Sequence, residues 1–75
     1  RRRRVGATEA VDDQMLNHLI IDSGCEIATR GGQSYVGIYG GVETIHGEWS
    51  VLVAQASGTV SIPMHCIEDA APTIL

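Results

Sequence analysis

The sequence predicts a mostly β domain in which one N-terminal α-helix precedes five short antiparallel strands that form a small barrel. Three observations predict this fold class. Glycine-containing turn signals recur along the chain and separate short segments rich in valine and isoleucine. Residues 31–43 hold five glycines among β-forming residues, which is typical of a strongly bent strand. One stretch with helical spacing of apolar residues comes before the strands.

The predicted helix covers residues 11–22. Asp12 and Asp13 are typical of a helix start, because their side chains accept bonds from free N–H groups and favour the positive end of the helix dipole. Apolar residues then recur on one helix face, namely Met15, Leu16, Leu19 and Ile20. We expect Gly24 to end this helix as its C-cap.

The strands are expected at residues 25–29, 33–44, 49–56, 59–62 and 70–75. The second is the long bent strand, with Gly31 and Gly32 in the turn before it and Gly37 at its bend. Pro63 cannot donate a hydrogen bond to a ladder, so the fourth strand must end there or lie at an edge. A tight turn is expected at residues 64–67.

The charge is divided unevenly along the chain. Four of the five basic residues form a run at the start, Arg1, Arg2, Arg3 and Arg4, and from Val5 onward one arginine stands against nine acidic residues. We therefore predict a basic arm and connector at residues 1–10 and a barrel domain at residues 11–75. An acidic barrel is a poor general phosphate binder, because Lys and Arg supply most of the affinity for nucleic acid. The arginine run is either an arm that binds an anionic partner or a solvated tail.

The composition favours a non-enzymatic, cytoplasmic protein. The sequence shows no signal peptide and no apolar run of membrane-spanning length, and its two cysteines form no Cys-x-x-Cys pair. No nucleophile and base lie in a recognisable catalytic pattern, and the three histidines have no recognised metal-ligand spacing. We expect no cofactor and no metal. A core of 75 residues stabilises a monomer only marginally, which favours a homo-oligomer.

The order of one helix and five antiparallel strands is typical of SH3-like barrels, and three motifs over residues 12–71 resemble the Sm-like family (LSm and Hfq-type proteins). Residues 13–17, Asp-Gln-Met-Leu-Asn, resemble the opening of the family's helix. Gly32 and Gly37, followed by Glu43, resemble its glycine and acidic pattern. Residues 60–67, Val-Ser-Ile-Pro-Met-His-Cys-Ile, resemble the second Sm motif.

This resemblance implies a ring of six or seven copies, joined by pairing between edge strands, that binds single-stranded RNA at its pore and faces. The RNA-binding positions that it implies are Glu43, Ile45 and His65. Ile45 would supply apolar contact, and His65 hydrogen bonding or stacking. Glu43 would accept a hydrogen bond from a base edge or hold the interface between copies. An additional RNA-binding arm would be formed by Arg1, Arg2, Arg3 and Arg4.

The chain departs from the Hfq-type pattern where that pattern contacts RNA. Met64 replaces a lysine, Pro63 a tyrosine, Asp12 a glutamine, and Ile20 and Ile21 a pair of arginines. Each change removes a positive charge, a hydrogen-bond donor or a stacking group. The alternative is therefore a ring-forming structural or protein-interaction module, of the kind found in mobile elements or phages, that binds a protein partner.

Tyr35 and Tyr39 lie four residues apart and share a face of a regular strand. They either form a platform on which bases stack or pack in the core or at a subunit interface. Packing is the favoured interpretation, because a chain without phenylalanine needs its few aromatic residues for burial.

Overall fold

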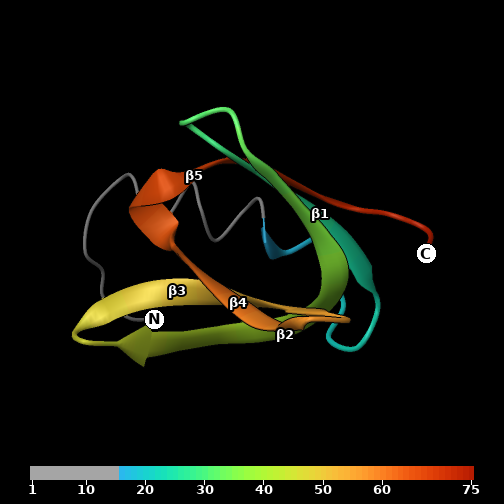
Figure 1. Ribbon diagram of the computed structural model, residues 1–75, viewed down its shortest axis with the longest axis horizontal. Helices are drawn as coiled ribbons and strands as arrows, with labels where there is room; N and C mark the ends of the chain where they lie inside the picture. Colours follow the sequence, from blue (N-terminus) through green and yellow to red (C-terminus); the bar gives the residue numbers. More distant parts are fainter. Residues whose placement is uncertain (1–15) are drawn as a thin grey trace.

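The structure, a computed structural model, describes residues 16–75. Its elements follow the predicted order of short strands and tight turns (Figure 1). They are β1 (Gly24–Thr29), β2 (Ser34–Ile45), β3 (Glu48–Gln55), β4 (Gly58–Pro63), the 3₁₀ turn η1 (Met64–Cys66) and β5 (Ile67–Pro72). Four of the five strands lie within one residue of their predicted bounds, whereas β5 begins and ends three residues before its predicted bounds.

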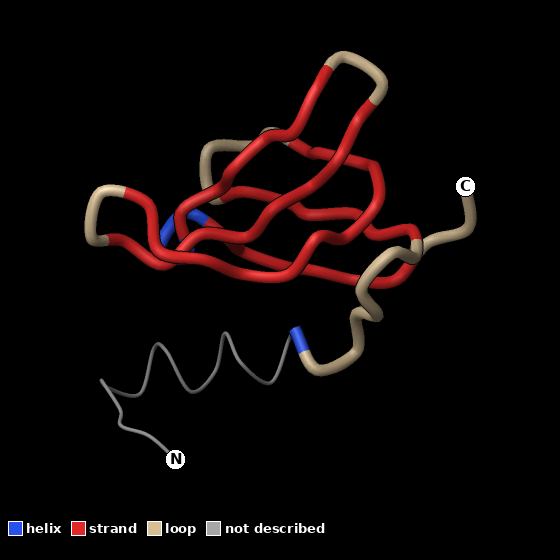
Figure 2. The backbone as a smooth tube through the Cα atoms, turned by 90° about the horizontal axis from the view of Figure 1, so that it is seen from below, coloured by secondary structure: helices blue, strands red, loops and turns tan. Residues whose placement is uncertain are grey.

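The strands form one antiparallel sheet in the order β4-β3-β2-β1-β5 (Figure 1). The prediction of five antiparallel strands is thus confirmed. Within residues 16–75 the sheet is open, because β4 and β5 are its outermost strands and no ladder joins them. Strongly bent strands turn the two parts of the sheet toward one another (Figure 1 and Figure 2). Closure into a barrel is not shown by this strand order.

Strand β2 connects the two parts of the sheet. It pairs with β1 over Ser34–Ile38 and with β3 over Ile38–Ile45. The register with β3 shifts between Tyr39 and Val42. The irregularity therefore lies at residues 40–41, where Gly41 has φ 91°, a conformation that L-residues with side chains rarely adopt. The register shift does not lie at Gly37, the residue at which the bend is expected from the sequence.

The core is built from alternate residues of the strands. Strand β1 alternates as predicted, with Cys25, Ile27 and Thr29 buried and Glu26 exposed between them. The core is made of Leu19, Cys25, Ile27, Tyr39, Val51, Val53, Ile62, Met64, Ile67 and Ala70. Each strand contributes to it, so burial of these apolar side chains holds the two parts of the sheet together.

The predicted helix over residues 11–22 falls partly outside the described residues, which begin at 16. Leu16 is the only described residue in α-helical conformation, and the amide of Leu19 donates to its carbonyl across 2.9 Å to form a turn. The prediction is wrong for residues 17–22. Among the described residues, no helix is long and apolar enough to cross a membrane.

Contacts with β2 explain why no helix continues to residue 22. The amide of Asp22 donates to the carbonyl of Tyr39 across 2.8 Å, and the amide of Tyr39 donates to the carbonyl of Ser23 across 2.9 Å. Asp22 adopts φ 73°, which reverses the chain between the preceding turn and β1. Gly24 is consequently the first residue of β1 and not a helix cap.

Candidate functional site

Two of the predicted site residues meet at Glu48, the first residue of β3. Ile45, at the end of β2, lies opposite Glu48 in the β2–β3 ladder. The Nδ1 atom of His65 in η1 lies 3.7 Å from the Oε2 atom of Glu48. The side chains of His65 and Glu48 are 66% and 56% exposed, so both polar groups are available to a ligand.

Glu43 lies on the same face of the sheet as Ile45, two residues before it in β2. It is exposed and pairs with the buried Ser50, which in turn pairs with Pro63 of β4. Alternation along β2 places Glu43 on the face that carries Ile45. The structure thus places the predicted site residues of β2 on one face.

The predicted arm is not part of the site that the structure describes. Its four residues precede residue 16, where the described part of the chain begins. The RNA-binding role predicted from the sequence therefore stays a prediction for Arg1, Arg2, Arg3 and Arg4.

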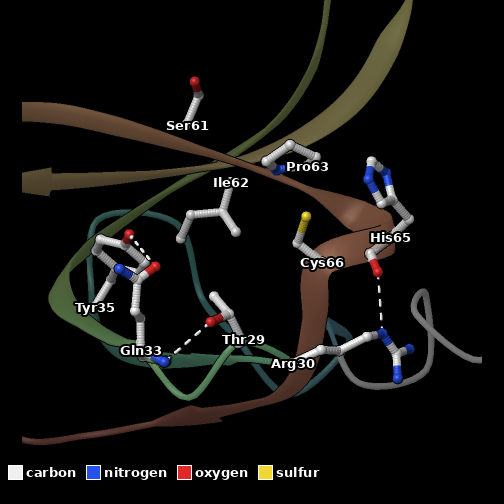
Figure 3. Close-up of a pocket in the computed structure, with 10 residues that line it drawn as sticks. Thr29, Arg30, Gln33, Tyr35, Ser61, Ile62, Pro63, His65 and Cys66 are labelled. Atoms are coloured by element: carbon white, nitrogen blue, oxygen red, sulfur yellow. Dashed lines mark hydrogen bonds between the residues drawn. The ribbon is translucent and has the colours of Figure 1, made fainter.

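A groove of about 390 Å³ lies beside this face, between β4 and the turn that follows β1 (Figure 3). Its lining comprises Thr29, Arg30, Gly31, Gln33, Tyr35, Ser61, Ile62, Pro63, His65 and Cys66. Of these residues only His65 was predicted as a site residue. One feature of the sequence could have pointed to the groove, because Arg30 is the only Lys or Arg after the N-terminal arginine run. Arg30 precedes two glycines, however, and a turn at that position explains the segment without a functional role.

Thr29 holds one wall of the groove in place. Its Oγ1 atom accepts a hydrogen bond from the amide of Gln33 across 3.1 Å, and its own amide donates to the Gln33 carbonyl across 2.8 Å. The amide of Gly32 donates to the Thr29 carbonyl across 3.0 Å, and Gly32 adopts φ 91°. These bonds close a tight turn, so Arg30 projects from a fixed backbone.

Arg30 connects this turn to η1. Its Nε atom donates to the carbonyl of His65 across 3.0 Å (Figure 3). Its amide donates to the carbonyl of Cys66 across 2.8 Å. His65 therefore belongs both to the groove and to the face that carries Glu43 and Ile45. Its backbone carbonyl binds Arg30 in the groove, and its imidazole lies near Glu48 on that face. Within residues 16–75 the terminal nitrogens of Arg30 have no hydrogen-bond partner, so they can bind other acceptors.

Tyr35 and Gln33 form the opposite wall. The Tyr35 hydroxyl donates to the Oε1 atom of Gln33 across 3.1 Å, and the Tyr35 ring packs against the core (Figure 3). Tyr39, further along β2, is 7% exposed and belongs to the core. The packing interpretation of this pair is thus confirmed for Tyr39, whereas Tyr35 has a polar edge at the groove.

The two cysteines are both free thiols. Burial raises the pKa of the Cys25 thiol, which favours its protonated form. Cys66 is half-buried and lines the groove. Within residues 16–75, no three His, Cys, Asp or Glu side chains gather where they would hold a metal ion. The site therefore offers hydrogen bonding, one cation and apolar contact.

Compared with family models, curated proteins and solved structures, the chain matches none.

Proposed function

We propose that this protein is a ring-forming module of the Sm-like type that binds single-stranded RNA on the face carrying Glu43, Ile45 and His65. The observation that carries the proposal is the open strand order, in which β4 and β5 are edges that no other strand of the described part of the chain covers. Ring formation and RNA binding are separate steps, and each has its own support.

The edges support ring formation. A free edge exposes unpaired N–H and C=O groups, which proteins cover or pair to avoid uncontrolled association. β4 and β5 are each six residues long. Pairing β4 of one copy with β5 of the next is a head-to-tail contact, and such contacts close into a ring when the rotation between copies allows it. The resemblance to the Sm-like family sets the expected number at six or seven copies.

The face that carries Glu43, Ile45 and His65 supports RNA binding. In a ring, each copy would repeat Ile45 as an apolar contact and His65 as a hydrogen-bonding or stacking group for a base. Glu43 would accept a hydrogen bond from a base edge. Phosphate contacts would come from the N-terminal arginine run, because residues 16–75 hold only one arginine and no lysine.

A second candidate function follows from the charge. Residues 16–75 contain six acidic residues against Arg30 alone. A ring with this excess of carboxylates attracts a basic protein segment through long-range electrostatics and repels phosphates. In this alternative the ring is a structural module and binds protein instead of RNA.

Native mass spectrometry at micromolar protein concentration tests the ring, with a six- or seven-copy mass expected. Fluorescence anisotropy with uridine-rich and adenine-rich RNA at low salt tests the ligand. Low salt favours phosphate contacts, so the absence of binding below about 10 μM would contradict RNA binding and leave the protein-binding alternative. Removal of Arg1, Arg2, Arg3 and Arg4 measures the contribution of the arm.

A variant pair locates the RNA site. We expect His65→Ala to weaken RNA binding about tenfold, since one base–side-chain contact is worth ~1–3 kcal/mol. His18→Ala is the matched control, because His18 is exposed and precedes β1. Equal effects of the two substitutions would contradict the proposed position of the site.

A further inference from the structure

We propose that the groove between β4 and the turn after β1, called here the Arg30 groove, is a second binding position for the same RNA strand. The groove takes one base, and the Arg30 guanidinium binds the phosphate that links this base to the nucleotide held at His65. This inference rests on the proposed RNA binding. It adds a path for the strand, which leaves the face that carries Glu43, Ile45 and His65 and enters the groove.

The Arg30 groove has the size and the walls that a base requires. Its volume of about 390 Å³ lies at the lower end of the range for sites that hold small organic molecules, about 300–1,000 Å³. Ile62 and Pro63 of β4 and the aromatic ring of Tyr35 of β2 line it with carbon atoms. Aliphatic and aromatic side chains of this kind bind the flat face of a base without regard to its sequence.

Gln33 supplies hydrogen bonding at the wall formed with Tyr35. Its Oε1 atom accepts from the Tyr35 hydroxyl across 3.1 Å, which orients the side-chain amide. Within residues 16–75 the Nε2 atom has no hydrogen-bond partner, so its two N–H donors can bind acceptors on the edge of a base. The backbone of Gln33 is fixed as well, because its amide donates to the Oγ1 atom of Thr29 across 3.1 Å.

Arg30 lies at the end of the groove that the strand would pass. Its Nε atom donates to the His65 carbonyl across 3.0 Å, and Figure 3 shows the guanidinium beside His65, away from Tyr35. That bond holds the guanidinium in place, and the terminal nitrogens have no partner in the described part of the chain. Arginine binds phosphate through two parallel N–H bonds, so the terminal nitrogens of Arg30 fit a phosphate at this end of the groove.

His65 connects the two binding positions. Its carbonyl holds Arg30, and its imidazole, which is 66% exposed, lies 3.7 Å from Glu48 on the face that carries Glu43 and Ile45. One residue therefore joins the group that contacts a base on that face to the guanidinium that binds the next phosphate. The contacts in the groove come from side chains, so they leave the backbone of β4 available for pairing in the ring.

The salt dependence of RNA binding tests the phosphate contact. For a single strand, each phosphate contact contributes about 0.7 to the slope of log affinity against log salt concentration. We expect Arg30→Gln to reduce this slope by about 0.7 and to weaken binding at low salt about tenfold. Arg30→Lys keeps the charge and should keep the slope. Ser57→Glu, in the exposed turn before β4, changes the net charge by the same amount and should also keep it. A wild-type slope for Arg30→Gln in anisotropy titrations would overturn the phosphate contact.

Two readouts test the base position. Gln33→Ala should weaken RNA binding about fivefold at every salt concentration without changing the slope, because it removes a hydrogen-bond donor and no charge. Ser57→Ala is the neutral control, and equal affinities of the two variants would overturn the base position. In the wild-type chain, ultraviolet cross-linking to RNA that contains 4-thiouridine should attach the base to a residue of the groove, which mass spectrometry of the peptides locates.

The outcomes separate this inference from the proposed function. Absence of RNA binding by the wild-type chain would overturn both. RNA binding that His65→Ala weakens, with cross-links confined to peptides outside the groove, would overturn this inference alone. If circular dichroism shows that Arg30→Gln does not fold, Gln33→Ala and the cross-links decide, because Gln33 is exposed and its backbone bond to Thr29 remains in that variant.

Discussion

Replacing Gly37 by alanine tests how β2 passes over β3. A Cβ atom at residue 37 would overlap the carbonyl oxygen of Ala54 and lie 2.8 Å from the Cγ1 atom of Val53. Both atoms belong to the β2–β3 contact. Because the carbonyl is backbone and not the end of a flexible side chain, relief requires the two strands to move apart.

The expected cost follows from these contacts. Overpacking a well-packed site costs typically ~1–3 kcal/mol. The lower entropy of the unfolded alanine chain offsets about 0.4–1 kcal/mol. With a backbone atom as the obstacle, we expect a net destabilisation of about 2 kcal/mol from these two effects. For a domain of this size that lowers the melting temperature by about 8–16 °C.

Thermal unfolding followed by far-UV circular dichroism measures the shift, at one protein concentration because assembly makes the melting temperature concentration-dependent. Gly31→Ala is the matched control. A Cβ atom there meets only the Oγ1 atom of Thr29, at an ordinary 3.9 Å. Equal melting temperatures for the two variants would refute the argument that the close approach of β2 and β3 requires glycine at residue 37.

Three further predictions concern the two thiols and Thr29. Cys66 should react with a thiol reagent faster than Cys25, since it is half-buried at the groove whereas Cys25 is fully buried, and equal rates in the two single-alanine variants would contradict this. The free energy of unfolding should fall as the pH rises above the ordinary thiol pKa of 9.0, because burial raises the pKa of Cys25 and the folded chain keeps a proton that the unfolded chain loses. Urea unfolding at about pH 7 and pH 10 should show a smaller fall for Cys25→Ala, and an equal fall would contradict the assignment. Thr29→Val should lower the free energy of unfolding in urea by about 1 kcal/mol, because it removes the acceptor of the Gln33 amide; a wild-type value would show that this hydrogen bond does not stabilise the fold.

The candidate face was predictable in part, because its residues lie in elements that the sequence places well. In the structure, Ile45 and Glu48 flank the turn at His46 and Gly47, and a tight hairpin brings such residues opposite one another. The proximity of His65 to Glu48 depends on η1, whose position is set by the packing of Met64 in the core. Residues 17 apart in sequence carry no pattern that predicts a 3.7 Å contact between their side chains.

Local patterns in the chain were sufficient to predict most strands and turns. Glycine and proline act within one or two residues of themselves, and alternation along a strand is a local pattern, so β1 to β4 were predictable within one residue. The turn at Gly32 follows from the same local chemistry.

Contacts between distant segments decided which local tendency prevailed. The helical spacing around Leu19 did not produce a helix at residues 17–22, because the backbones of Asp22 and Ser23 bond to Tyr39, which lies 16 or more residues away. Contacts between β2 and β3 likewise place the register shift at residues 40–41 and make Gly37 the residue where the two strands approach most closely. The same non-local contacts created the Arg30 groove and the open edges on which both proposals rest, because a backbone group or a guanidinium acquires its partners only when distant strands meet.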